Sequence, residues 1–188
     1  MKKFAAAVVG LIAVAALVVF VQPVRNVVWN VAVETVCDGR DVADLALMDE
    51  RLSKKILPII DTLKEEGYAF QVSSVHRSPA RQKCLYDISK RIKKITMGRL
   101  KGVTTVSKGC HNNMKNGKPA SLAIDLHIYE SHARNVAFYL RLRALVRKAG
   151  LESGGDFKKT NPLWAKDDLG WDPGHVQVPA CRSLLRIN

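Results

Sequence analysis

The chain of 188 residues lacks the signatures of several common protein classes. It has no Cys-x-x-Cys pair, which argues against a structural zinc site. It has no internal repeat or low-complexity tract, and its helical and strand-like segments do not alternate regularly, which predicts an α+β domain rather than a parallel sheet. Acidic residues are scarce: 17 Asp and Glu stand against 30 Lys and Arg, so the formal net charge is +13.

Much of the positive charge lies in residues 83–101 and 141–148. It permits three interpretations: a nucleic-acid-binding surface, a solvated helix face, or a surface attracted to anionic membrane headgroups and an acidic cell-wall polymer. The third interpretation suits an exported protein best, and the N-terminal residues indicate export. We therefore expect no nucleic-acid partner.

Only one long apolar run without charge is present. It covers the eighteen residues 4–21, just long enough for a membrane-spanning helix. Lys2 and Lys3 precede it, so the N-terminus should stay in the cytoplasm and the remainder should be exported. The alternative is a signal peptide that is cleaved at the small-x-small sequence Ala13–Ala15.

This pattern predicts the organisation of the chain. We expect a signal anchor over residues 1–24, a juxtamembrane linker over 25–44 and the folded domain over 45–188. The protein would cross the inner membrane once and hold its folded domain in the periplasm. The inner membrane is thus an expected partner, through the N-terminal segment.

All four cysteines follow the apolar run, so they would face an oxidising compartment. An even number permits two disulfide bonds with three connectivities, among which the sequence does not choose. The four residues are Cys37, Cys84, Cys110 and Cys181.

Two histidines and two acidic residues form a set that suits a hydrolytic zinc site. A catalytic zinc takes three protein ligands and leaves one position for water. His111, Asp125 and His175 supply two imidazoles and one carboxylate, and Asp172 adds a spare carboxylate. A single histidine is more often an ordinary polar residue than a ligand, so the prediction depends on the joint pattern. Other divalent metals can bind similar sets.

Local patterns place two of these residues on strands. Residues 123–128 have the pattern of a short buried strand with one acid, Asp125, and a buried carboxylate is costly unless it is paired or bound to metal. Residues 175–178 have the pattern of a second strand directly after an Asp-Pro-Gly turn. We expect His127 to face away from Asp125 and therefore not to bind the same metal.

These motifs resemble those of the zinc peptidases that include bacterial D-alanyl-D-alanine carboxypeptidases and the L-alanyl-D-glutamate endopeptidases found as phage endolysins. The family pattern has a Ser-x-His segment, then Ala-x-Asp-Leu, then Gly-Gly-Asp with an aromatic residue, then Asp-x-x-His followed by an apolar residue and Gln or Glu. Upstream, residues 73–82 are similar to the family's strand-to-helix element, and the match extends over residues 45–181. The matching segments are Cys110-His111, Ala123–Leu126, Gly154–Phe157 and Asp172–Gln177.

The chain departs from the family pattern in two places. Gly109 stands where the family has Ser, and the interval from His111 to Asp125 is longer than is common. The additional residues include the pair Asn116-Gly117.

The resemblance implies a small antiparallel sheet with packed helices, the hedgehog/D,D-peptidase-like zinc fold. It implies that His111, Asp125 and His175 bind Zn²⁺. It also implies that Asp172 is the general base that takes a proton from water during hydrolysis of a peptide bond in peptidoglycan.

Arg77 is the candidate for polarising the scissile carbonyl or for binding a substrate carboxylate, because a guanidinium offers a fixed fork of donors. The alternative is that Arg77 braces the domain through Asp125 or Asp156. Asp156 and Gln177 are further candidates for substrate binding.

Three functions remain open at this point. An L-alanyl-D-glutamate endopeptidase is favoured, because residues 154–157 and 172–175 resemble the endolysin branch. A D-alanyl-D-alanine carboxypeptidase is the near alternative, and a nonenzymatic cell-wall or zinc-binding protein is the alternative of a different class. We expect a monomer. The alanine-rich apolar run is also similar to the signal-anchor-release segments of some phage endolysins, so release into the periplasm and permanent anchoring both stay open.

Spacing and capping residues predict the main elements. Apolar residues at helical spacing predict a helix over residues 52–63, which Pro58 would start, kink or divide. Residues 69–74 have the pattern of a strand, and Ser78-Pro79 that of a helix start. A further helix is expected over residues 131–149.

Overall fold

The computed structural model describes residue 37 and residues 40–95, 108–157 and 166–184. The chain divides into two units, residues 1–39 and 40–188, and every element below belongs to the second. The apolar run predicted as an anchor lies outside the described residues. No helix in the described part of the chain is long and apolar enough to cross a membrane.

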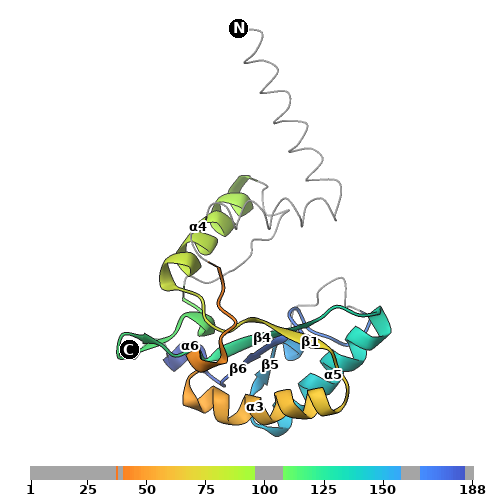
Figure 1. Ribbon diagram of the computed structural model, residues 1–188. Coiled ribbons are helices and arrows are strands. Elements are labelled where there is room, and N and C mark those ends of the chain that lie inside the picture. Colours follow the sequence, from red (N-terminus) through yellow and green to blue (C-terminus); the bar gives the residue numbers. More distant parts are fainter. Residues whose placement is uncertain (1–36, 38–39, 96–107, 158–165, 185–188) are drawn as a thin grey trace, which may run out of the picture. The chain divides into compact units, whose positions relative to one another are not determined.

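A four-stranded antiparallel sheet lies at the centre of the second unit, with β1 and β5 at its edges and β4 and β6 between them (Figure 1). Its strands, in spatial order, are β1 (Phe70–Ser74), β4 (Ala123–Ile128), β6 (His175–Gln177) and β5 (Glu152–Ser153). The strands expected at residues 69–74, 123–128 and 175–178 are confirmed to within one residue at each end. The expected α+β class with an antiparallel sheet is also confirmed.

Four α-helices accompany the sheet in the described residues: α3 (Glu50–Glu65), α4 (Pro79–Ile95), α5 (His132–Lys148) and α6 (Cys181–Leu184). The predicted helix starts are confirmed, because the hydroxyls of Ser78 and Ser131 accept from the N–H groups of Arg81 and Arg134. Short 3₁₀ turns are η1 (Leu45–Leu47), η2 (Cys110–Asn112) and η3 (Gly154–Asp156).

Pro58 neither starts nor divides its helix, since α3 runs through it. A proline lacks the N–H that would bond the carbonyl of the residue four earlier, here Lys54. Both residues are exposed, so water can satisfy that carbonyl. The rest of α3 is stabilised by its buried side, which carries five apolar residues: Leu52, Ile56, Ile59, Ile60 and Leu63.

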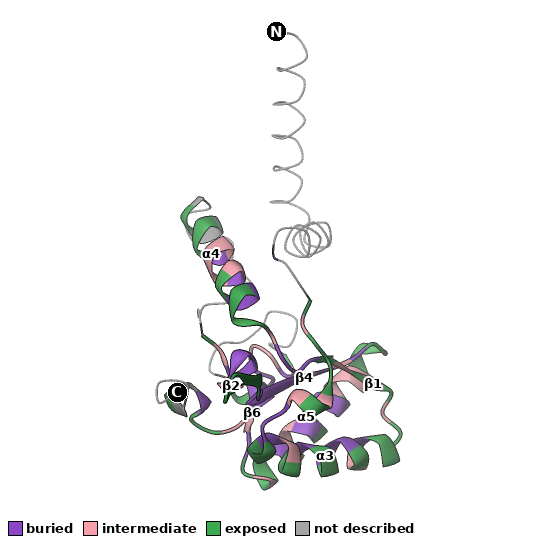
Figure 2. Ribbon diagram, turned by 60° about the vertical axis from the view of Figure 1, so that its left-hand side comes forward, coloured by how far each residue is buried: buried purple, intermediate pink, exposed green. Residues whose placement is uncertain are grey.

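Helices α3 and α5 lie on the same side of the sheet (Figure 1), and each carries buried residues among exposed ones along its length (Figure 2). Their buried residues form one core with Ile124, Leu126 and Ile128 of β4 and Val176 of β6. Side chains alternate between the two faces of a strand. The residues between these core positions therefore face away from the two helices, and they include Asp125, His175 and Gln177.

The same alternation corrects one expectation. His127 is two residues from Asp125, so it lies on the same face of β4 and not on the opposite one. The burial pattern agrees: Asp125 and His127 are partly exposed, whereas Leu126 between them is buried. His127 nevertheless lies outside the group of residues that the structure brings together as potential metal ligands.

Candidate metal centre

The pairing register of β4 and β6 sets two of the expected ligands side by side. Asp125 and His175 are direct partners across the two antiparallel strands. His175 begins β6 immediately after the turn that contains Pro173 and Gly174. A Cβ at Gly174 would lie 2.2 Å from the carbonyl oxygen of Leu126. Glycine is therefore required for this turn to approach β4 closely enough.

The third expected ligand, His111, comes from η2 and is fixed by backbone contacts. The N–H of Arg77 donates to the carbonyl of His111 at 3.0 Å, and the N–H of Leu122 donates to that of Cys110 at 2.9 Å. The turn is thereby tied both to the end of β1 and to the start of β4.

The long interval between His111 and Asp125 does not separate them in space, because the additional residues fold as a hairpin. Strands β2 (Met114–Lys115) and β3 (Lys118–Pro119) pair through a two-residue turn at Asn116-Gly117, with φ values of 53° and 74°. Positive φ at both central residues is the geometry that favours Asn-Gly. The hairpin closes where the N–H of Ala120 donates to the carbonyl of Asn113 at 3.0 Å.

Three potential ligand atoms then converge. His175 Nδ1 lies 2.8 Å from Asp125 Oδ1, and His111 Nε2 lies 3.3 Å from each of these atoms. Ligands at about 2.0–2.2 Å around a tetrahedral zinc are separated by roughly 3.3–3.6 Å. Two of the three separations match this range and the third is slightly short. The donor set therefore fits zinc in both chemistry and spacing.

Hydrogen bonds on the far sides of both imidazoles orient them for metal binding. His111 Nδ1 lies 2.9 Å from the carbonyl oxygen of Val75, which can only accept, so this nitrogen carries the proton and Nε2 presents a lone pair. His175 Nε2 lies 3.0 Å from Oε1 of Gln177 and donates to it, which leaves Nδ1 for the centre. Metal-bound histidines use such outer hydrogen bonds to fix tautomer and ring orientation.

Charge in the cluster shifts the proton affinities of its members. Burial disfavours the charged form of His175, but the hydrogen bond to Asp125 and the charges of Asp125 and Asp172 raise the pKa of His175 to about 9. Burial likewise opposes ionisation of Asp125, yet His111 and His175 hold its pKa well below the usual range. Without metal, a proton on His175 Nδ1 joins the two residues. Metal binding at this nitrogen would release that proton.

Asp172 stands beside the cluster as a carboxyl of different character. Burial, together with the charge of Asp125, raises the pKa of Asp172. Its carbonyl accepts from the N–H of His175 at 3.0 Å, which fixes the turn that holds both residues. The structure thus contains one ionised carboxylate among the potential ligands and a second carboxyl whose affinity for a proton is increased.

The Gly-Gly-Asp segment supports this turn. A Cβ at Gly154 would lie 2.0 Å from the carbonyl oxygen of Asp172 and 2.9 Å from Cβ of His175. Only glycine allows η3 to pack so closely against the turn. Asp156, a candidate for substrate binding, forms ion pairs with Arg147 and Arg143 of α5, and these contacts brace η3 against the helix.

Burial lowers the pKa of Arg77, but the hydrogen bond and charge of Asp41 raise it, with smaller contributions from Asp125 and Asp172. Arg77 is therefore close enough to the cluster to interact with its charges. Its main partner is Asp41, which sequence reasoning missed. Arg77 Nε donates to Asp41 at 2.9 Å, Nη2 donates to the same carboxylate, and Nη1 donates to Gln82 at 3.0 Å. The bracing contact is thus to Asp41, and not to Asp125 or Asp156.

Asp41 belongs to residues 40–44, which the sequence analysis placed in the linker but which form part of the second unit. Val42 pairs with His76, and its N–H donates to the His76 carbonyl at 2.8 Å. Asp41 also accepts from Arg81 Nε at 2.9 Å and from the Ser74 hydroxyl at 3.2 Å. Nothing in the local sequence distinguishes Asp41 from other acidic residues near the start of a domain.

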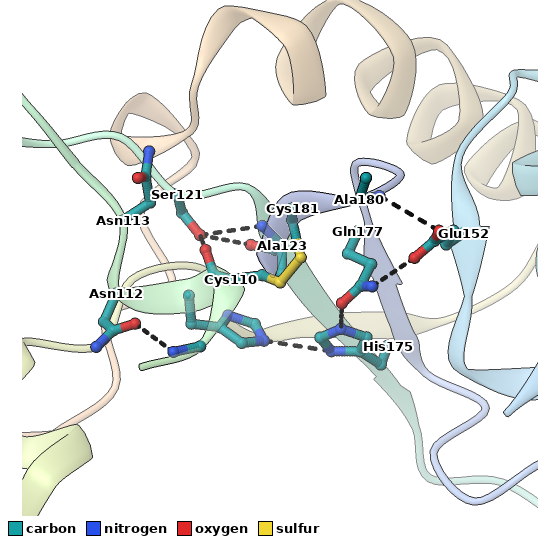
Figure 3. The surroundings of a disulfide bond; sticks show 12 residues. Cys110, Asn112, Asn113, Ser121, Ala123, Glu152, His175, Gln177, Ala180 and Cys181 are labelled. Carbon is teal, nitrogen blue, oxygen red and sulfur yellow. Dashed lines mark hydrogen bonds between the residues drawn. A yellow bond between two sulfur atoms is a disulfide. The ribbon is translucent and has the colours of Figure 1, made fainter. Parts of the chain in front are cut away.

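A disulfide bond joins Cys110, next to His111, to Cys181 at the start of α6 (Figure 3). Both residues are buried with Leu122 and Ala123. The bond closes a loop of 71 residues, and such a link typically stabilises a fold by roughly 2–4 kcal/mol. Cys37 and Cys84 are also disulfide-bonded, so no cysteine is free.

No protein-family model matches the chain, and no curated protein matches it. Several solved structures are similar to it. The LD-carboxypeptidase LdcB, described for peptidoglycan recognition, has 16% identity and a TM-score of 0.46, and the match covers 74% of this chain and 64% of LdcB. VanYB in complex with D-alanine-D-alanine has 17% identity and a TM-score of 0.47, with 74% and 76% of the two chains covered.

A mutant of the vancomycin-resistance D,D-pentapeptidase VanY, in complex with Zn(II), has 16% identity and a TM-score of 0.42, with 74% and 77% covered. The chain spans less than two thirds of the length of LdcB.

Proposed function

We propose that this protein is a zinc-dependent peptidase that hydrolyses a peptide bond in the stem peptide of peptidoglycan. The observation that carries the proposal is the convergence of His111 Nε2, Asp125 Oδ1 and His175 Nδ1 within 3.3 Å of one another, beside the carboxyl of Asp172. A zinc ion, when bound, would lower the pKa of a water molecule toward about 7 and polarise the scissile carbonyl.

Asp172 is the proposed general base and acid. It would take a proton from the attacking water and deliver it to the leaving amine. Its raised pKa suits this exchange, because a carboxyl that is too acidic is a poor proton acceptor. Positioned proton transfer of this kind is typically worth about 10² to 10⁴ in rate.

Arg77 is the proposed residue for binding a substrate oxygen. A guanidinium has five N–H donors. The contacts to Asp41 and Gln82 use one N–H on each of its three nitrogens, which leaves two donors for a substrate carbonyl or carboxylate. Because Asp41 fixes the fork, these donors would be oriented before the substrate arrives.

The choice of peptidoglycan is supported by the motif resemblance and by the excess of basic residues, which suits an acidic cell-wall polymer. Within this class we propose an L-alanyl-D-glutamate endopeptidase, with a D-alanyl-D-alanine carboxypeptidase as the second candidate. We further propose that the protein is a monomer, that its N-terminal segment places it in the inner membrane, and that the catalytic unit faces the periplasm.

Mass spectrometry of muropeptides after digestion by the zinc-loaded, full-length protein tests the proposal. Cleavage between L-alanine and D-glutamate gives a disaccharide that ends in L-alanine, whereas a carboxypeptidase releases free D-alanine. If the protein holds zinc yet leaves the muropeptides unchanged, it is a binding protein and the proposed function is wrong.

A further inference from the structure

Gln177, expected to bind substrate, has both ends of its amide occupied inside the protein. Its Oε1 lies 3.0 Å from His175 Nε2, and its Nε2 lies 2.5 Å from Oε2 of Glu152 (Figure 3). Gln177 is buried, and Glu152 comes from the edge strand β5, which pairs with β6. The three side chains form a line that leads from the sheet edge to the candidate metal centre.

The direction of protons along this line is determined by Glu152. A carboxylate can only accept, so the end of the Gln177 amide that faces Glu152 is the NH₂ group. The carbonyl end therefore faces His175 and can only accept, which places a proton on His175 Nε2. The remaining ring nitrogen, Nδ1, is therefore the one that can bind metal, once it releases the proton that it shares with Asp125 in the metal-free protein.

We propose that Glu152 is a positioning residue for the metal centre: acting through Gln177, it selects the tautomer of His175 that can bind zinc. This inference rests on the proposed zinc site and concerns a residue outside the three ligands and outside the motifs read from the sequence. Partners of this kind, one contact beyond the ligands, typically change metal affinity by 10- to 100-fold when they are altered.

Glu152→Gln is the informative substitution. The second oxygen of Glu152 accepts from the N–H of Ala180 at 3.4 Å. The introduced amide would therefore keep its oxygen on Ala180 and turn its NH₂ group toward Gln177. The amide of Gln177 then turns over, its NH₂ group faces His175, and the proton of the imidazole moves to Nδ1. The double variant Glu152→Gln with Gln177→Glu restores the original direction, since the new carboxylate accepts from both the new amide and His175.

The experiment measures the zinc dissociation constant of the full-length protein by competition with a chromophoric chelator, without substrate. We expect Glu152→Gln to weaken zinc binding by about tenfold or more, and the double variant to recover most of the affinity. The control is Glu65→Gln, which removes a charge from an exposed position and should bind zinc like wild type. A purely structural role for Glu152 does not predict recovery by reversal. Wild-type affinity in Glu152→Gln, or no recovery in the double variant, would overturn the proposal.

Nitrogen-detected NMR of the wild-type zinc form gives a second measurement that needs no variant to fold. We expect His175 to carry its proton on Nε2, and a proton on Nδ1 with zinc on Nε2 would contradict the relay. Failure of the proposed function would look different, because the zinc-loaded wild type would then bind metal normally and hydrolyse nothing.

Discussion

Asp125 and His175 face each other across β4 and β6, and the 2.8 Å contact between Oδ1 and Nδ1 is the shortest edge of the candidate metal centre. The pairing is specific, because a shift of one residue in register would turn one of the two side chains into the helical core. Burial of Ile124, Leu126 and Val176 against α3 and α5 opposes such a shift. The hydrophobic pattern that folds the sheet therefore also assembles two of the three ligands.

Replacing the carboxyl of Asp172 separates chemistry from metal binding. Asp172→Asn nearly preserves shape but cannot accept the proton of the attacking water. We expect zinc content and melting temperature to stay close to wild type while the rate of muropeptide hydrolysis falls by about 10² or more. A near-normal rate in this variant would remove Asp172 from the mechanism.

Substitution of Arg77 tests the role of its fork of donors. Arg77→Lys keeps the charge but loses the paired geometry toward Asp41 and the two donors assigned to substrate. We expect kcat/KM to fall by about tenfold or more with unchanged zinc content. A loss mainly in kcat indicates stabilisation of the transition state, and a rise in KM alone indicates uniform substrate binding. Unaltered kcat and KM would show that Arg77 only braces the fold.

Some elements of the fold and some residues of the candidate site could be predicted from the sequence, and others could not. Helices α3, α4 and α5 and strands β1, β4 and β6 were predictable because apolar spacing and Ser caps act locally. The candidate ligands were also recognisable, since His111, Asp125 and His175 fall in a spaced motif. The fold places these three together and keeps Asp172 beside them.

The supporting contacts were not predictable, because they join residues that are distant in the chain. Asp41 reaches Arg77 over 36 residues, and Glu152 reaches Gln177 over 25. The pairing of Cys110 with Cys181 was not predictable either, since four cysteines permit three connectivities. The face on which His127 lies was predictable from strand alternation alone, and the expectation was wrong on that point.

Acid should destabilise the protein partly through Asp41. Burial raises the pKa of Asp41, but the hydrogen bonds and charges of Arg77 and Arg81 outweigh this and lower it below the ordinary value of 3.8. A carboxylate of this kind contributes stability at pH values above its unfolded-state pKa and loses that contribution as pH falls through its folded-state pKa. Below about pH 4, the melting temperature should therefore fall more steeply in wild type than in Asp41→Asn.

The control for this measurement is Asp44→Asn, because Asp44 is exposed. At pH 7 we expect Asp41→Asn to be the less stable of the two variants. Parallel curves of melting temperature against pH for wild type and Asp41→Asn would show that Asp41 does not contribute in this way.

The N-terminal segment leads to a prediction about location. Six of the eighteen residues in the apolar run are alanine and one is Gly10, so its burial in lipid gains less than that of a leucine-rich span. On the proposal that the segment is releasable, fractionation should show full-length protein moving from membrane to periplasm when the membrane potential collapses. Replacing Ala5, Ala6, Ala13 and Ala16 by Leu should retain it. Protein that stays in the membrane, or that begins after Ala15, would contradict release.

X-ray absorption spectroscopy at the zinc edge tests the central claim most directly, because it reports which atoms bind the metal. For the wild type we predict one zinc per chain with nitrogen and oxygen ligands at about 2.0–2.2 Å, including the scattering of two imidazoles. His175→Ala should lose the metal, and His132→Ala, at an exposed histidine, should keep it. Sulfur ligands at about 2.3 Å, or undiminished zinc in His175→Ala, would contradict the assignment.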